Sequence, residues 1–208
     1  MKDPIKRLEG FRALPLVRID APETALPLAE ALEKGGLPCL AATFRSAACL
    51  PGLRRIRQGL PDFLAGAGDI MDARQGRQAI EAGAEFLLSP ILSPSLLELG
   101  RETGIPVIPG CATPTELAGA LGAGCSLVNF FPAEALGGVQ VLEAVSGPFD
   151  HARFLVSNGV DQRNFRDYLA SPKVRVCGVK WIASVELVNG GRYEEIARLT
   201  GELVRELA

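Results

Sequence analysis

The stretch FLAGAGDIMDARQGRQAIEAGAEFLL, from Phe63 to Leu88, holds two short apolar runs separated by an amphipathic segment. The runs Phe63–Ala67 and Phe86–Leu88 have the length and composition of buried strands. Between them, apolar residues at three- and four-residue spacing predict a helix. A strand, a helix and a second strand in this order predict a βαβ unit, in which the two strands are parallel.

The same alternation repeats along the chain about every 20 to 25 residues. The other strand candidates are Ala13–Ile19, Pro38–Ala42, Pro106–Ile108, Ser126–Phe130, Phe154–Val156 and Val174–Cys177. No linker or low-complexity tract interrupts these eight units. They predict an α/β fold with a single domain over residues 1–208, which is a (β/α)8 TIM barrel preceded by a short N-terminal helix.

Several helix starts carry a proline or an acidic residue in the first turn, as helix N-termini commonly do. They are Ala21-Pro22-Glu23-Thr24, Ser93-Pro94, Thr113-Pro114-Thr115-Glu116 and Pro132-Ala133-Glu134. The loops that precede such helices follow the carboxyl ends of the strands, where (β/α)8 barrels carry their active sites. The candidate site residues are therefore Arg45, Asp69, Ser89, Pro90, Gly110, Cys111, Asn129, Ser157, Asn158, Gly159, Gly178, Val179 and Lys180.

Charge and hydropathy exclude several classes of partner. The net charge is −2 and no run of basic residues exceeds Arg54-Arg55, so a nucleic acid is not expected. The N-terminal segment lacks the apolar core of a signal peptide, and no apolar run approaches the ~18 residues of a membrane span. These patterns predict a cytoplasmic protein with no membrane partner.

The cysteines and the single histidine do not form a metal site. The five cysteines are spread without metal-type spacing and are expected to be reduced thiols, and nothing near Cys111 would activate it. His151 is the only histidine and stands in a turn-like segment, which excludes mechanisms that need two imidazoles. No metal and no other cofactor is predicted.

A second set of segments resembles the 2-keto-3-deoxy-6-phosphogluconate (KDPG) and 2-keto-4-hydroxyglutarate (KHG) aldolase family nearly end to end. The FFPAE stretch at 130–134 and the GAG stretch at 66–68 are the most specific. The supporting segments are Leu14-Pro15-Leu16-Val17, Leu88-Ser89-Pro90, Ile108-Pro109-Gly110, Gly137-Gly138-Val139, Gly147-Pro148-Phe149 and Asn164-Phe165-Arg166-Asp167-Tyr168-Leu169.

The resemblance implies a class I mechanism with a Schiff-base lysine directly before FFPAE, where this chain has Asn129. An amide nitrogen is not a nucleophile, although it can hydrogen-bond a carbonyl. The family's proton-shuttling glutamate matches Ala41, and its threonine after GAG matches Asp69. The arginine that binds the substrate carboxylate is retained as Arg45.

The resemblance also implies a phosphate cradle made by a Gly-Gly pair and a Gly-Ser pair after the last two strands. The corresponding residues here are Ser157-Asn158-Gly159 and Gly178-Val179-Lys180. One glycine remains in each loop, and Lys180 adds a full positive charge where the family uses amide dipoles. An altered anion site is predicted.

The roles of Lys180 and Asp69 stay open. Lys180 is the only lysine that follows a strand, since Lys2, Lys6, Lys34 and Lys173 lie elsewhere. It is a relocated Schiff-base lysine with Asp69 as its proton shuttle, a cation for a phosphate or carboxylate, or a solvent-facing side chain. Asp69 faces the pocket or caps the helix that begins near Asp72.

Arg45 and Asn129 have alternatives too. Arg45 binds a ligand carboxylate or forms a surface salt bridge. Strand alternation puts Asn129 on the face opposite its neighbours Val128 and Phe130, in the barrel interior. There its amide bonds a ligand or neighbouring polar groups.

The expected function is a divergent aldolase-family enzyme, a carbon–carbon lyase or related enzyme that acts on a small 2-keto acid or its phosphate without a metal. The alternative is a catalytically silent barrel that binds a sugar-acid phosphate or similar anion. The resemblance implies a homotrimer.

Overall fold

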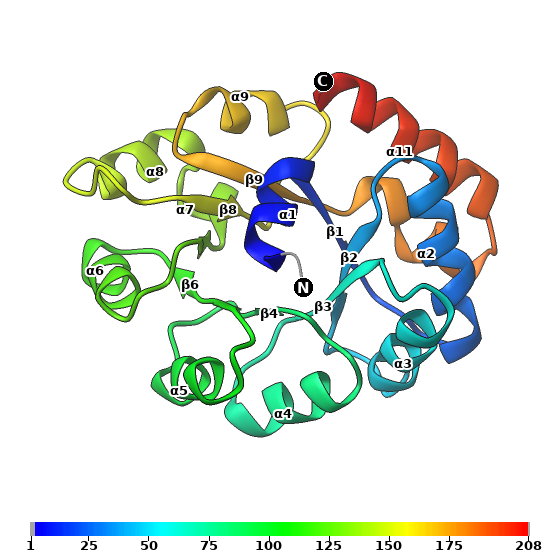
Figure 1. Ribbon diagram of the computed structural model, residues 1–208. Coiled ribbons are helices and arrows are strands. Elements are labelled where there is room, and N and C mark those ends of the chain that lie inside the picture. The colour runs from blue at the N-terminus through cyan, green and yellow to red at the C-terminus, as the bar shows by residue number, and fades with distance from the viewer. Residues whose placement is uncertain (1–2, 208) are drawn as a thin grey trace.

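A ring of parallel strands forms the centre of the computed structural model, which describes residues 3–207 (Figure 1). The strands are β1 (Ala13–Val17), β2 (Cys39–Thr43), β3 (Leu64–Gly68), β4 (Leu87–Leu88), β5 (Val107–Ile108), β6 (Gly110–Cys111), β7 (Val128–Phe130), β8 (Phe154–Val156) and β9 (Val174–Val179). They pair in the order β5-β4-β3-β2-β1-β9-β8-β7-β6, and each pair is parallel. This arrangement confirms the predicted (β/α)8 barrel.

The helices lie on the outer side of the ring, except α1, which lies across one end of it (Figure 1). They are α1 (Pro4–Phe11), α2 (Ala25–Lys34), α3 (Cys49–Gly59), α4 (Ala73–Glu81), α5 (Pro94–Thr103), α6 (Pro114–Gly122), α7 (Ala133–Leu136), α8 (Gly138–Ser146), α9 (Phe165–Ala170), α10 (Val185–Asn189) and α11 (Tyr193–Leu207), with 3₁₀ turns η1 (Pro22–Thr24) and η2 (Trp181–Ala183). The predicted starts hold: α5 and α6 begin at prolines, and Thr113 and Glu116 form a capping box on α6.

The fifth strand of the barrel is split at Pro109, so nine segments occupy eight strand positions. Before the proline, β5 pairs with β4, and after it β6 pairs with β7. Pro109 has no N–H to donate, but its carbonyl accepts the N–H of Asn129 at 2.8 Å. The expected strand Pro106–Ile108 is therefore only the first half of this position.

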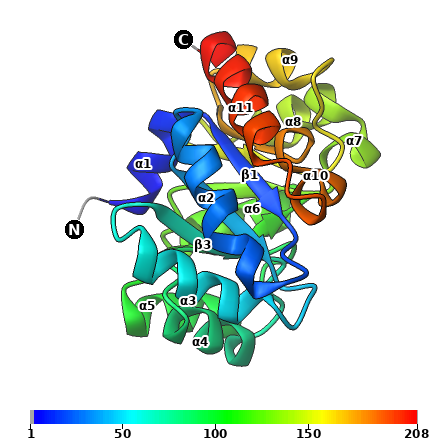
Figure 2. The ribbon, with the colours of Figure 1, turned by 90° about the vertical axis from the view of Figure 1, so that its right-hand side faces the viewer.

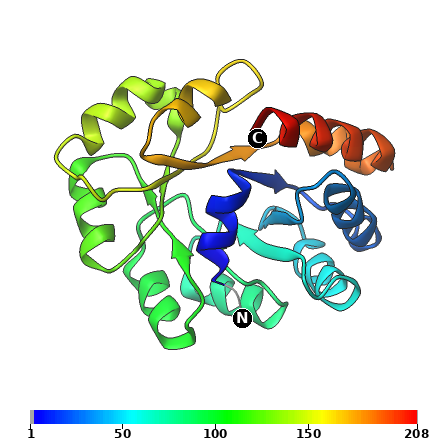
Figure 3. The same ribbon diagram turned by 45° about the horizontal axis from the view of Figure 1, so that its top comes forward.

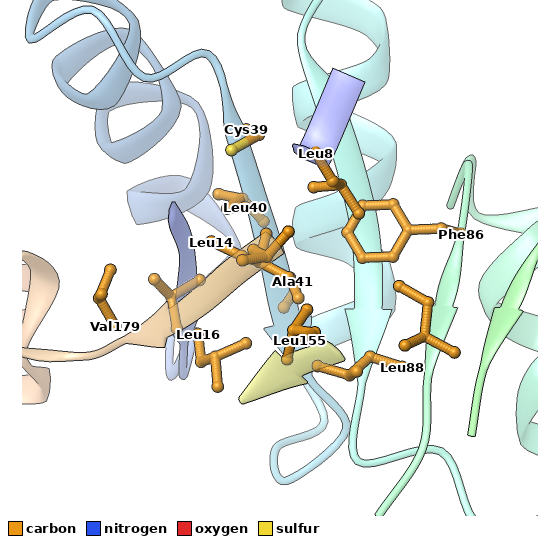
Figure 4. Close-up of a cluster of buried hydrophobic side chains, with 14 of the residues drawn as sticks. Leu8, Leu14, Leu16, Cys39, Leu40, Ala41, Phe86, Leu88, Leu155 and Val179 are labelled. Atoms are coloured by element: carbon orange, nitrogen blue, oxygen red, sulfur yellow. The ribbon is translucent and has the colours of Figure 1, made fainter. Parts of the chain in front are cut away.

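Apolar side chains fill the barrel interior. Gly66 on β3 is required there, because a Cβ at this position would come within 2.3–2.5 Å of the Phe86 ring. Figure 4 shows Phe86, Ala41 and Leu155 among the buried side chains, with Leu8 entering from α1. Helix α1 lies across one end of the barrel (Figures 1 and 3), so Leu8 closes that end.

The opposite end is the one that carries the candidate site. Figure 2 shows α1 on the left and α7 and α10 on the right, beyond the carboxyl ends of the strands. Strand β1 ends at Val17, not at the predicted Ile19, so Arg18 lies in the loop at this end. Over residues 3–207, no helix is both long enough and apolar enough to cross a membrane.

Candidate functional site

A small pocket of about 30 Å³ lies at the carboxyl ends of the strands, and we call it the inner pocket. It receives side chains from the loops after β2, β3, β4, β8 and β9 and from β7 itself. Eight of the predicted site residues line it: Arg45, Asp69, Ser89, Pro90, Asn129, Ser157, Asn158 and Lys180. The barrel thus brings together residues that are far apart in the chain.

Asn129 lies in the inner pocket with only 2% of its surface exposed. Its Nδ2 donates to the carbonyl of Ser89 at 3.0 Å, and its Oδ1 accepts the hydroxyl of Ser157 at 2.7 Å. Neighbouring groups therefore satisfy the amide, which is one of the two alternatives left by the sequence. An amide has two N–H bonds and two oxygen lone pairs, so one of each remains for a ligand.

Arg45 and Asp69 form an ion pair across the pocket, from Nε of the guanidinium to Oδ2 of the carboxylate. The Arg45 side chain is 59% exposed and that of Asp69 is 24% exposed. Asp69 has a φ of 58°, a left-handed conformation that Asp tolerates better than most residues. The helix-capping alternative for Asp69 is wrong, because Asp72 caps α4 by accepting the N–H of Gln75 at 2.8 Å.

The loop after β8 is held against the FFPAE segment. The carbonyls of Ser157 and Asn158 accept the N–H groups of Ala133 and Glu134 at 3.0 and 3.2 Å. Asn158 has a φ of 73°, again in the left-handed region. The hydroxyl of Tyr168 donates to Glu134, and burial together with this contact raises the pKa of the phenol. These contacts fix the backbone that presents Ser157 and Asn158 to the pocket.

Three predicted binding residues lie behind the pocket lining. Gly159 packs on Glu134, because a Cβ there would come within 2.3 Å of the Glu134 Cβ. Gly178 packs in the same way on Leu16 and Ser157, and Val179 is fully buried in the apolar cluster of Figure 4. None of these three lines the inner pocket within the described part of the chain.

A larger pocket of about 530 Å³ opens outward from the inner one, and we call it the outer pocket. Its lining includes Lys180, Arg18 and Trp181, and it shares Arg45 and Asp69 with the inner pocket. Lys180 is exposed and lines both pockets, so it lies at the mouth of the barrel. Its three predicted roles stay predictions.

The other lysines of the described chain have different surroundings. The Lys34 ammonium pairs with Glu194 at 2.7 Å, and that of Lys173 donates to the carbonyl of Ser146 at 2.6 Å. Lys6 lies on α1 at the far end of the barrel, and Lys2 lies outside the described residues. Lys180 is thus the lysine that residues 3–207 supply to the pocket.

The cysteines and the histidine contribute no functional group to either pocket. All five cysteines are free thiols, and burial raises the pKa of the Cys111 thiol to about 12. His151 is exposed after α8. Among residues 3–207, no group of three or more His, Cys, Asp or Glu side chains is arranged to hold a metal ion.

Sequence reasoning missed Arg18 as a pocket residue. The predicted strand Ala13–Ile19 placed it inside a strand, whereas the structure ends β1 at Val17 and puts Arg18 on the outer pocket. The strand-end rule that selected the other candidates would have found it with the right boundary. Thr43, whose hydroxyl donates to the carbonyl of Val17 at 3.1 Å, was missed as well, although it directly follows the predicted strand Pro38–Ala42; in the structure it is the last residue of β2.

The barrel and its pocket define the chain as a (β/α)8 protein with a candidate small-molecule site at the carboxyl ends of its strands. Residues 5–199 match the family model for KDPG and KHG aldolase. The chain therefore belongs to the KDPG and KHG aldolase family, as its resemblance indicated.

Individual relatives agree with this assignment. The KHG/KDPG aldolase of Escherichia coli K12 is 37% identical over 92% of this chain and 90% of its own length. The 2-dehydro-3-deoxy-phosphogluconate aldolase of Haemophilus influenzae is 36% identical over 96% of this chain and 94% of its own. The KDPG aldolase of Legionella pneumophila, solved with pyruvate captured as a covalent carbinolamine intermediate, superposes with a TM-score of 0.93 at 35% identity, covering 97% of this chain and 98% of that one.

Proposed function

We propose that this chain is a divergent member of the aldolase family that binds a small 2-keto acid, phosphorylated or not, at the mouth of the barrel, where the inner pocket opens into the outer one. It acts there as a carbon–carbon lyase or a related keto-acid enzyme, without a Schiff base on β7. The observation that carries the proposal is that Arg45, Asn129 and Lys180 line one pocket at the carboxyl ends of the strands. A guanidinium binds a carboxylate and an amide N–H bonds a carbonyl, so the set matches a 2-keto acid.

The pairing of Arg45 with Asp69 is compatible with this binding. An ion pair as exposed as this one contributes only about 0 to 1 kcal/mol to stability. The carboxylate of a ligand can therefore share or take over the guanidinium at little cost. Asp69 then remains beside the reacting carbons as a candidate proton acceptor.

The position of the nucleophile distinguishes this chain from what the family resemblance implies. Asn129 stands where the resemblance implies the Schiff-base lysine, and Ala41 where it implies the glutamate. If the chain forms an imine, the amine available in the described residues is that of Lys180. The covalent step of aldol chemistry would then take place on the residue that follows β9 and not on a residue of β7.

The alternative is a silent barrel that binds a sugar-acid phosphate or a similar anion without turning it over. The hydrogen bonds of Asn129 favour it, because they use one N–H and one oxygen lone pair of the amide before any ligand arrives. The loss of both implied catalytic groups favours it as well.

Borohydride trapping with pyruvate, read by mass spectrometry of the digested protein, distinguishes the two. The enzyme proposal expects a reduced adduct on Lys180 that is absent from Lys180→Arg. Binding of pyruvate in calorimetry without an adduct would support the silent barrel. If the folded protein shows neither binding of pyruvate nor an adduct, both proposals are overturned.

If Lys180 acts as a cation and not as an imine-forming amine, its side chain is expected to bind the phosphate of a phosphorylated 2-keto acid. Because a charge-assisted contact is lost, Lys180→Ala should weaken this ligand by about ten- to a hundred-fold in calorimetry. Arg45→Ala should act mainly on the carboxylate end and weaken unphosphorylated 2-keto acids as well. Lys34→Ala, which removes an exposed lysine away from both pockets, is the control and should bind as wild type does. Equal binding by wild type and Lys180→Ala would show that Lys180 is a surface residue with no role in binding this ligand.

The chain is also proposed to form one domain and to assemble as a homotrimer. The proposal of one domain is supported by the single sheet that contains β1 to β9 and by the packing of α11 on α2. Light scattering of the purified protein tests the second.

A further inference from the structure

Two Asn-Gly pairs occur in this chain, Asn158-Gly159 and Asn189-Gly190. In such a pair the backbone nitrogen of the glycine can attack the side-chain amide of the asparagine, because glycine has no Cβ to hinder the approach. Each pair is therefore a candidate site of covalent change. The structure places the two pairs in different surroundings, and these decide which of them reacts.

Asn158 and Gly159 lie in the loop after β8, where the family resemblance implies a Gly-Gly pair. Both residues are exposed, and Asn158 also lines the inner pocket. Within residues 3–207, no hydrogen bond holds the side-chain amide of Asn158 or the N–H of Gly159. The two groups that would react are therefore both available.

The backbone around Asn158 is held at other atoms. Its carbonyl accepts the N–H of Glu134 at 3.2 Å, and the carbonyl of Gly159 accepts Nδ2 of Asn164 at 3.0 Å. The rotation of the Asn158 peptide that ring closure needs breaks the first of these bonds, which an exposed loop does by local opening. A Cβ at position 159 would come within 2.3 Å of the Glu134 Cβ, so the fold keeps a glycine after Asn158.

Asn189 is also exposed, but hydrogen bonds hold both of its reacting groups. It is the last residue of α10, and the N–H of Gly190 donates to the carbonyl of Glu186 at 3.0 Å. The side-chain Nδ2 of Asn189 donates to Oδ2 of Asp20 at 3.0 Å. Because attack by the Gly190 nitrogen requires both bonds to open, this pair is protected and serves as an internal control.

We propose that Asn158 is a site of spontaneous deamidation in the folded protein. The Gly159 nitrogen gives up its proton to base and bonds to Cγ of Asn158, and the bond from Cγ to Nδ2 breaks as ammonia leaves. Water then opens the resulting five-membered imide, which yields aspartate or isoaspartate. The reaction consumes water, releases ammonia and needs no oxidant or reductant.

The product places a carboxylate in the lining of the inner pocket. The described charged side chains of that lining are Arg45, Lys180 and Asp69, so their net charge is +1 and the new carboxylate cancels it. Anions are therefore bound less tightly after the conversion. This consequence rests on the proposed function, whereas the deamidation itself does not.

Peptide mapping of the full chain by mass spectrometry tests the proposal. Folded protein and protein unfolded in guanidinium chloride are incubated at mildly alkaline pH until most of Asn189 has converted in the unfolded sample. Trypsin then releases the two pairs in separate peptides, 154–163 and 181–192. In the folded sample Asn158 is expected to convert at least about tenfold faster than Asn189, because the protected pair must first break its two hydrogen bonds.

Two variants complete the design. Asn158→Gly removes the amide and suits the φ of 73° at this position, so its peptide 154–163 should show no conversion at residue 158. Asn158→Asp reproduces the aspartate product and should weaken pyruvate binding in calorimetry by about two- to fivefold, since exposed charges interact weakly. Thermal unfolding midpoints close to that of wild type establish that both variants are folded.

The outcomes separate the modification from its effect on the pocket. If Asn158 in the folded sample converts no faster than Asn189, the proposal is overturned. If Asn158 converts faster but Asn158→Asp binds pyruvate as tightly as wild type does, the modification site stands and its effect on anion binding is overturned. If wild type binds no pyruvate, the proposed function fails, while the peptide masses still decide whether Asn158 is deamidated.

Discussion

Purified protein is expected to cleave KDPG at no more than a trace rate. The loss of a covalent nucleophile removes several orders of magnitude in rate, because the enzyme can no longer divide one difficult step into two easier ones. Asn129 cannot replace it: its nitrogen is delocalised into the amide and already donates to the carbonyl of Ser89. The readout is pyruvate release in a coupled spectrophotometric assay.

The E. coli KHG/KDPG aldolase, run in the same assay, is the positive control. A turnover of about 10 per second or more by this chain, the usual range of enzymes, would contradict the expectation. If that activity vanished in Lys180→Arg, the amine of Lys180, just after β9, would have replaced the one implied on β7. A low rate on KDPG leaves other 2-keto acids open as substrates, as the proposed function requires.

Restoring both implied catalytic groups is expected to have the second large effect. Asn129→Lys alone should recover little activity, because Ala41 leaves proton transfer unassisted. Ala41→Glu alone buries a carboxyl group among apolar side chains, since Ala41 is fully buried in the cluster of Figure 4. Together the new lysine and glutamate supply nucleophile and proton shuttle, so the double variant should gain more than the two singles added.

Lyase rates of the two singles and the double, measured with KDPG, test this coupling. The matched control is Asn129→Lys with Ala41→Gln, which has nearly the same volume but no ionisable carboxyl, and it should stay near the Asn129→Lys rate. Circular dichroism and the thermal midpoint must show that each variant is folded, because Asn129→Lys also removes the acceptor of the Ser157 hydroxyl. Additive or absent gains in a folded double variant would count against the assignment of these two positions.

Much of the barrel could be predicted because strand and helix periodicities are local properties of the chain. The strand at Phe154–Val156 has the bounds that its apolar run predicted, and the capping residues of α6 were readable as a motif. The predicted strand bounds were wrong where pairing with a neighbouring strand decides where a strand ends. Strand β1 stops at Val17, although Ile19 continues the apolar pattern, because its ladder with β2 ends at the Val17–Ala42 pair. The interruption at Pro109 likewise depends on two different neighbours.

The candidate site was predictable as a set of strand ends but not as a geometry. The strand-end rule selected eight residues that do line the inner pocket, because the carboxyl ends of parallel strands meet at one end of a barrel. It also selected Gly178 and Val179, whose place behind the lining depends on packing against Leu16 and its neighbours. Side-chain direction at a strand end follows from the backbone turn there, which residue type alone does not specify.

The sequence by itself determined the family, the barrel and the chemical identity of the groups at positions 41 and 129, since these follow from residue types and local periodicity. The tertiary structure decided which charged side chains come together at the pocket. It paired Arg45 with Asp69, which takes a left-handed backbone just after β3, and it placed Arg18 and Lys180 on the lining of one pocket. Charges that are distant in the chain become neighbours through strand order and register, which long-range hydrogen bonding between strands establishes only in the folded barrel.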